Sequence, residues 1–135
     1  MSLSNFSTDL CVVTVNGRQL KDYGEAATPV TDAPIDAKRQ LRRGQGGSAV
    51  RLDRINPGRE VSIYLNPGSS DSAYMQGLYN SGANITYTYI QIGTLETALG
   101  SEGVIVNDGQ RGRGGSTITD DQFILHFNIW EATRG

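Results

Sequence analysis

The residue types that most often perform catalysis or bind metal ions are few in this chain. His126 is the only histidine and Cys11 is the only cysteine. One copy therefore cannot supply the histidines and cysteines that a zinc site requires, and it cannot form an internal disulfide. Cys11 lies in an apolar run, so we interpret it as a small buried hydrophobe. His126 lies within an alternating strand pattern, so we interpret it as a histidine of the core or of an interface.

The carboxylates and hydroxyls give no stronger indication of catalysis. Asp120 and Asp121 are adjacent, and neighbouring side chains of an extended chain point in opposite directions, so they do not form an acid/base pair. We expect them in a solvated turn before the last strand. No serine lies in a nucleophile-elbow motif, and no glycine loop carries the lysine of a phosphate-binding loop. The sequence therefore predicts no catalytic residues, no metal, no cofactor and no enzymatic activity.

Arginine is the residue type with the clearest pattern. Ten of the twelve basic residues are arginines, and the planar guanidinium group binds carboxylates at two points, which suits ordered interfaces. A cluster of seven basic residues falls within 22 residues, against only Asp53 and Glu60: Lys38, Arg39, Arg42, Arg43, Arg51, Arg54 and Arg59. We interpret the cluster as a surface that docks onto an acidic face of a partner, rather than as a merely solvated hairpin.

The acidic counterpart can lie on another copy of the same chain. The candidate carboxylates are Asp32, Asp36, Asp71, Glu96, Glu102, Asp120 and Asp121. Head-to-tail self-complementarity of this kind closes into rings or grows into filaments.

A second basic feature lies near the C-terminal end. Arg111 and Arg113 belong to the segment RGRGG, which resembles the RGG segments that bind single-stranded nucleic acid. One copy of such a segment more often forms a mobile loop or a contact between subunits. The net charge of −2 also argues against a general nucleic-acid binder, for which a domain pI above about 9 is expected.

These residues must be positioned by a mainly β architecture. The length of 135 residues is that of one domain, and seventeen glycines divide the chain into short segments rich in β-formers. The predicted strands are residues 10–15, 18–23, 59–65, 85–92, 95–99, 103–107 and 123–130, with an Asn16-Gly17 hairpin turn after the first. We expect Phe123, Leu125, Phe127 and Ile129 on one face of the last strand, and Trp130 on the other. The pattern predicts an antiparallel β-sandwich or barrel.

One helix and one long hairpin complete the predicted fold. Ser69, Ser70 and Asp71 supply a cap and a negative first turn for a packed helix over residues 69–80. Residues 35–55 read as a protruding β-hairpin arm around Gly44, Gly46 and Gly47, with limbs that reach roughly 30 Å. The limbs contain few apolar residues, and an isolated two-stranded hairpin is marginal in water. The arm therefore needs another surface to lie against.

The order of hairpin, arm, strand, helix and closing meander resembles that of bacteriophage tail tube proteins, especially those of contractile-tailed phages and prophages. The strongest similarity lies in residues 58–79, GREVSIYLNPGSSDSAYMQGLY, where a strand runs through a polar turn into a capped helix. The ending DDQFILHFNIWEA is similar to the closing strand of that family. Tube proteins of type VI secretion share the same general fold.

The resemblance implies a structural virion protein. Its subunits would join their sheets into hexameric rings, and the rings would stack into a hollow tube for passage of phage DNA into the host. The arm would reach across subunits, and the helix would lie outside the barrel. The implied partners are further copies of the chain and the sheath, tape-measure, tube-initiator and terminator proteins. The implied location is the virion tail, assembled in the bacterial cytoplasm.

DNA in transit must not adhere to the wall, and multiple phosphate contacts bind strongly. We therefore expect the arm arginines to face protein and the lumen to be polar and neutral to acidic. The N-terminus does not read as a signal peptide, and no stretch approaches the roughly 20 apolar residues of a membrane span, so we expect no membrane insertion.

The alternative is a β-barrel that binds single-stranded nucleic acid. The arm, the RGRGG loop and the stacking ability of Tyr87 and Tyr89 support it. Both tyrosines share a face with Ile85, however, and that face is expected to be core.

Overall fold

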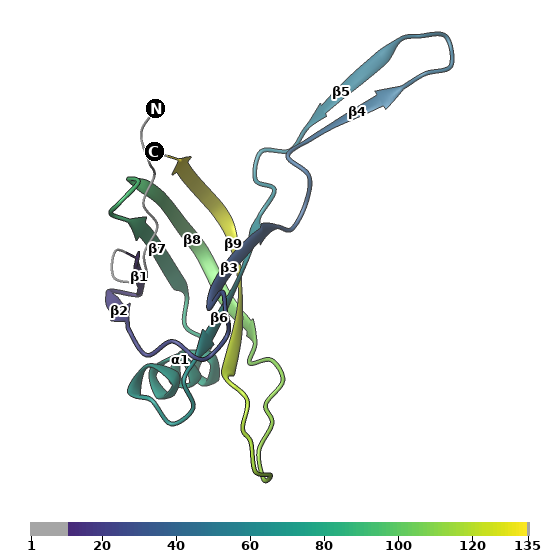
Figure 1. Cartoon of the computed structure of the whole chain (residues 1–135). Helices are drawn as coiled ribbons and strands as arrows, with labels where there is room; N and C mark the ends of the chain where they lie inside the picture. Colours follow the sequence, from purple (N-terminus) through teal and green to yellow (C-terminus); the bar gives the residue numbers. More distant parts are fainter. Residues whose placement is uncertain (1–10, 135) are drawn as a thin grey trace.

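The computed structural model describes residues 11–134, and their main element is an antiparallel seven-stranded sheet curled into a half-barrel (Figure 1). The strand order is β2-β1-β7-β8-β9-β6-β3. The strands are β1 (Cys11–Val15), β2 (Arg18–Leu20), β3 (Val30–Pro34), β6 (Arg59–Leu65), β7 (Ile85–Gln91), β8 (Glu96–Asn107) and β9 (Asp121–Arg134). The predicted fold class, antiparallel and mainly β with one packed helix and a protruding hairpin, is confirmed. Residue 10 of the predicted first strand lies outside the described residues.

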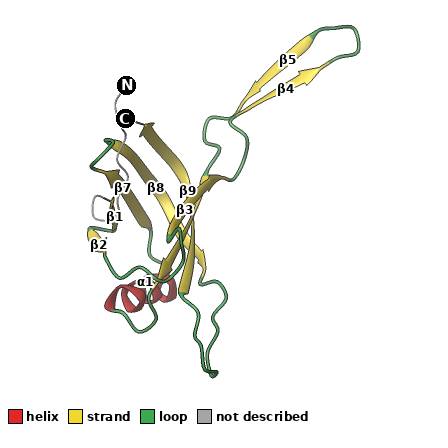
Figure 2. Cartoon of the chain, viewed as in Figure 1, coloured by secondary structure: helices red, strands yellow, loops and turns green. Residues whose placement is uncertain are grey.

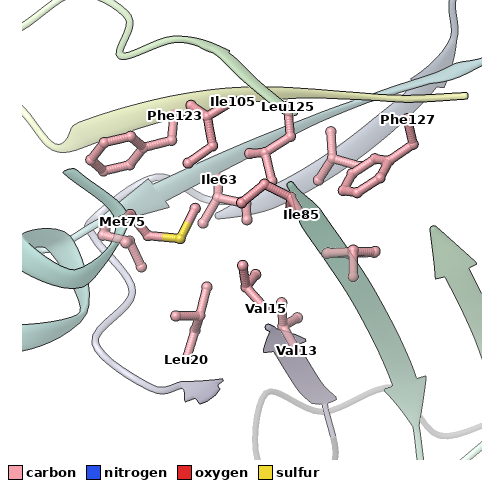
Figure 3. Packing of buried hydrophobic residues seen from close by; sticks show 13 residues of the cluster. Val13, Val15, Leu20, Ile63, Met75, Ile85, Ile105, Phe123, Leu125 and Phe127 are labelled. Atoms are coloured by element: carbon pink, nitrogen blue, oxygen red, sulfur yellow. The ribbon is translucent and has the colours of Figure 1, made fainter. Parts of the chain in front are cut away.

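The core fills the inner face of the curled sheet. Strict alternation along β6, one of the predicted strands, buries Val61, Ile63 and Leu65. Side chains from β1, β6, β7 and β9 converge there with Met75 of the helix (Figure 3). The outer face of the sheet stays partly exposed, since Leu99 and Val104, which alternate with buried positions of β8, are exposed.

The alternation predicted for β9 is wrong beyond Phe127. Ile129 is 37% exposed, whereas Trp130 packs against the core and stacks on Tyr87 with a centroid distance of 5.5 Å. Gly100, the β8 partner of Trp130, makes room for this arrangement, because a Cβ atom there would lie 3.0 Å from both the Trp130 and the Phe127 rings. The Trp130 ring therefore lies on the core face of the sheet, beside Gly100, which has no side chain to block it.

Two predicted strands of the C-terminal half are one strand. Residues 95–99 and 103–107 were expected to be separate, but β8 is continuous because β9 pairs with it from Glu96↔Arg134 to Asn107↔Ile124. Gly103 lies inside this long strand, where a Cβ atom would come within 2.2 Å of Phe127. The second limb of the first hairpin is shorter than predicted, since β2 ends at Leu20.

Helix α1 (Ser70–Ser81) lies at the end of the sheet opposite the arm (Figure 2). Ser69 caps it by accepting a hydrogen bond from the Ser72 backbone N–H, and Gly82 ends it in the left-handed conformation. Asp71 anchors the helix, since its buried carboxylate accepts hydrogen bonds from the backbone N–H groups of Lys21 and Asp22 and from Arg18. Within residues 11–134, no helix has the length and apolar character to cross a membrane.

The arm is a separate two-stranded sheet that points away from the body (Figure 1). It consists of β4 (Arg39–Arg43) and β5 (Ala49–Asp53), joined by the glycine-rich tip. All ten strand residues are exposed. At its base, the backbone N–H groups of Ile35 and Asp36 donate to the carbonyls of Gly58 and Pro57. The arm therefore lacks a core of its own.

Candidate assembly surface

The strand register divides the arm residues between two exposed faces. One face carries Arg39, Leu41, Arg43, Ala49, Arg51 and Asp53, and the other carries Gln40, Arg42, Val50 and Leu52. Leu41 is 62% exposed and Val50 is 57% exposed. Each face thus combines arginine with uncovered apolar side chains. Such a surface suits a partner that both buries the apolar groups and supplies negative charge.

Carboxylates of the same chain neutralise only part of the arm's charge. Asp53 lies 3.0 Å from Arg51 and 3.5 Å from Arg39, and Asp36 lies 3.8 Å from Arg54. These pairs are exposed, so each stabilises the arm little. Among the described residues, Lys38, Arg42 and Arg43 have no carboxylate within 4 Å.

Charge is divided unevenly between the arm and the rest of the chain. Residues 38–54 hold six basic residues against Asp53 alone and carry a net charge of +5. Since the whole chain carries −2, the remaining residues carry −7. The arm of one copy and the body of another are therefore electrostatically complementary.

Arg59 is not part of the arm, although the sequence grouped it with the arm arginines. It begins β6, and its guanidinium pairs with Asp32 of β3, with an Nε to Oδ1 distance of 2.9 Å. The same group lies 5.6 Å from the centre of the Trp130 ring. Arg59 therefore ties β3 to the sheet within its own subunit, and Asp32 is already occupied by it.

Arg111 and Arg113 also make contacts within their own chain. Arg113 bonds the carboxylate of Asp121 and the backbone carbonyls of Gly112 and Thr119, and Arg111 lies 3.6 Å from Asp121. These contacts hold the base of the loop formed by residues 108–120. The groups that an RGG segment would offer to nucleic acid are thus largely engaged.

The solvated turn predicted for Asp120 and Asp121 is wrong. Asp121 is 7% exposed and also accepts a hydrogen bond from the Ser72 hydroxyl at the start of α1. Asp120 accepts from the backbone N–H groups of Glu25 and Ala26. Both carboxylates connect segments that are distant in the sequence. The fact that Asp120 and Asp121 are neighbours does not indicate these contacts.

Most of the predicted acidic candidates are therefore used inside the subunit. Arg18 and two backbone amides hold Asp71, and Glu102 accepts a hydrogen bond from Asn128. Of the candidate carboxylates, Glu96 forms no ion pair within residues 11–134. Glu131, which the sequence analysis did not name as a candidate, also forms none there. Glu131 is exposed on β9 beside the end of the sheet.

The tyrosines of β7 are placed as the sequence predicts. Tyr87 is 1% exposed, and its burial raises the pKa of the phenol. Tyr89 is half-buried and packs against the core cluster. The described residues contain no group of three or more potential metal ligands. Tyr87 therefore presents no exposed ring face of the kind on which bases stack.

Comparison with known proteins supports the fold reading. Neither a protein-family model nor a curated protein matches the chain. Among solved structures, it is similar to the anti-feeding prophage cap (AFP tube terminating cap), with a TM-score of 0.60 and 14% identity over 100% of this chain and 95% of that chain. It is also similar to a chain of the native gene transfer agent virion, with a TM-score of 0.64 and 10% identity over 94% and 98%.

A third similar structure is a chain of the PVC sheath-tube complex of an extracellular contractile injection system. Its TM-score is 0.62, with 12% identity over 97% of this chain and 93% of that chain. At these identities the likeness is one of fold. The fold of the chain is that of contractile-tail tube-type proteins, which confirms the resemblance found in the sequence.

Proposed function

We propose that the chain is a structural, non-enzymatic virion protein whose copies form hexameric rings that stack into a hollow tail tube. The observation that carries the proposal is the arm. All of its strand residues are exposed, and it has no core to offset the entropy lost when it is ordered. Binding to a second subunit supplies the missing contacts.

The open half-barrel supports the same function. Among residues 11–134, its outermost strands are β2 and β3, and no further described strand pairs with the outer edge of either. Joining neighbouring sheets around a ring hides such edges, and a head-to-tail contact of this type closes when the rotation between subunits fits. Helix α1 then lies outside the closed barrel.

The tube gives phage DNA a passage into the host. The arm arginines face protein, and the lumen is polar and neutral to acidic, so that the phosphates do not adhere. The chain resides in the virion tail after assembly in the bacterial cytoplasm. Its partners are other copies and, at the tube's surface and ends, sheath, tape-measure, initiator and terminator proteins.

Electron microscopy of the purified protein at increasing concentration tests this function. Rings or tubes with a central hole are expected. A monomer that persists at high concentration would overturn the proposal. A reconstruction with most arm arginines in the channel would overturn the lumen assignment alone.

The observations favour this function over binding of single-stranded nucleic acid. Tyr87 is buried, and Arg113 is held by Asp121. Oligonucleotide titration separates the two functions. A tube subunit shows little affinity at any salt concentration, whereas a nucleic-acid binder shows an affinity that falls steeply as salt increases.

A further inference from the structure

Strand β9 has an unpaired edge along its second half. The pairing of β6 with β9 ends at Arg59↔Phe127, whereas β9 continues to Arg134 with only β8 beside it. Within residues 11–134, no other strand pairs with residues 128–134. This edge exposes a row of backbone N–H and C=O groups that can bond an incoming strand.

The edge is open because the chain turns away from it just before β6. Continued pairing would place residues 55–58 beside β9, but Gly58 has a φ of +77°, a conformation that favours glycine, and Pro57 has no N–H to donate. Ile35 packs against this turn, since a Cβ atom on Gly58 would lie 3.1 Å from the Ile35 Cδ1 atom. The arm that leaves at this point diverges from β9 (Figure 1).

A hollow of about 350 Å³ lies where the chain has turned away. Its lining combines apolar residues with charged ones: Pro34, Ile55, Pro57 and Trp130 beside Asp36, Lys38 and Arg59. Ile55 is 92% exposed there. An added strand would gain backbone hydrogen bonds from the edge and space for apolar side chains beside Trp130. Peptides added to sheet edges are recognised in this way.

The arm is the segment of the chain that fits this edge. Its strand β5 has a free outer edge, places Val50 and Leu52 on one face, and places Arg51 on the other. The first face suits the hollow beside Trp130, and the second suits Glu131, which has no ion pair among the described residues. The charges of +5 on the arm and −7 on the rest of the chain favour contact between the arm and the body of another copy, while residues 128–134 carry only Glu131 and Arg134 and are neutral overall.

We propose that the open edge of β9, residues 128–134, is the docking site for the arm of a second copy, which adds to the sheet as an extra strand. This rests on the proposed self-assembly and names the surface that receives the arm. The turn at Gly58 therefore both projects the arm of one subunit and keeps open the edge that the next arm fills.

Disulfide cross-linking between two differently labelled copies tests the proposal. Both carry Cys11→Ser. One carries a cysteine on the arm (Val50→Cys or Leu52→Cys), and the other carries one on the edge (Glu131→Cys or Thr133→Cys). The control is Val106→Cys, at an exposed site on β8 away from this edge. Under assembling conditions, we expect arm–edge disulfides and few with position 106. Assembly without arm–edge disulfides, or with equal yields at position 106, would overturn the docking site alone.

Charge reversal gives an independent measurement. Glu131→Arg should raise the concentration needed for assembly roughly tenfold, a change equivalent to about 1.4 kcal/mol, whereas Glu25→Arg should change it little. An unchanged threshold for Glu131→Arg would count against the proposed contact. If the unmodified protein does not self-associate at all, both this docking site and the proposed function fail.

Discussion

Asp121 shows how much of this fold depends on single polar side chains. Its buried carboxylate bonds the Ser72 hydroxyl at the start of α1 and Arg113 of the loop 108–120. It also begins β9, so one residue joins a helix, a loop and the longest strand. Conversion to the amide leaves the guanidinium without an anionic partner and replaces one of the two acceptor oxygens with a donor.

Asp121→Asn should lower the free energy of unfolding by about 1–3 kcal/mol, the usual effect of leaving buried or charged partners unsatisfied. Thermal or denaturant unfolding followed by circular dichroism measures it. Asp53→Asn is the matched control, because its carboxylate is exposed on the arm, and it should change stability by less than about 0.5 kcal/mol. Similar losses in both variants would contradict the anchoring role of Asp121.

Asp71 makes stability depend on pH. Burial alone would raise the pKa of its carboxyl, but hydrogen bonds from the Lys21 and Asp22 backbone and from Arg18 outweigh burial and lower the pKa. The folded protein thus holds this proton less tightly than the unfolded chain does. The stability contributed by Asp71 is therefore complete above the unfolded pKa of about 3.9 and is lost as pH falls through the folded pKa.

Asp71→Asn should consequently reduce the loss of stability on acidification below about pH 4, although the variant is less stable at neutral pH. Denaturant unfolding of both proteins between pH 2 and 7 provides the comparison. Parallel stability curves for the two proteins over the acid range would show that Asp71 does not titrate as described.

At the scale of elements, β8 and β9 fit together because β8 carries glycines beneath the aromatic residues of β9. A Cβ atom on Gly103 would lie 2.2 Å from the Phe127 ring, while Gly77 on α1 faces open space. These two glycines give opposite expectations for the same substitution.

Gly103→Ala should destabilise the protein by roughly 1–3 kcal/mol, because the buried Phe127 ring must move in a packed core. Gly77→Ala should stabilise it by about 1 kcal/mol, since alanine is the better helix former. Unfolding curves of both variants against the unmodified protein measure these changes. A neutral Gly103→Ala would mean that β8 and β9 are less closely packed than the structure indicates.

At the scale of the whole molecule, folding and assembly use different parts of the chain. Within the described part of the chain, the buried core cluster lies in the half-barrel and α1, and the arm strands pair with each other and with no other strand. The body can therefore be stable without the arm, whereas the proposed assembly cannot form without it.

Deletion of residues 38–54, with a short Gly-Ser bridge, should leave the thermal unfolding of the monomer nearly unchanged and abolish rings and tubes. Calorimetry and electron microscopy on the same preparation measure the two properties. A control replaces only the tip residues Gln45 and Gly46 with serine and should still assemble. Loss of the folded body on deletion would instead place the arm in the folding unit.

The sequence by itself determined the features that depend on neighbouring residues. Alternation defined β6, the serine cap placed the start of α1, and the scarcity of apolar residues marked the arm as a hairpin that needs a partner. The order of these elements was sufficient to predict the fold class, because each short-range pattern gives an element and its exposed or buried face.

Only the tertiary structure determined which distant residues the polar side chains contact. Arg59 left the predicted arm cluster because Asp32 lies beside it across the sheet, and Asp121 became buried because Ser72 and Arg113 converge on it. Trp130 lies on the core face because the alternation of β8 and β9 changes beside Glu102, which has a φ of +51°, and Gly100 leaves room for the ring. The β9 edge is open because the chain turns at Gly58. Each outcome depends on groups from distant parts of the chain that contact one another in the fold. Their spacing in the sequence does not indicate these contacts.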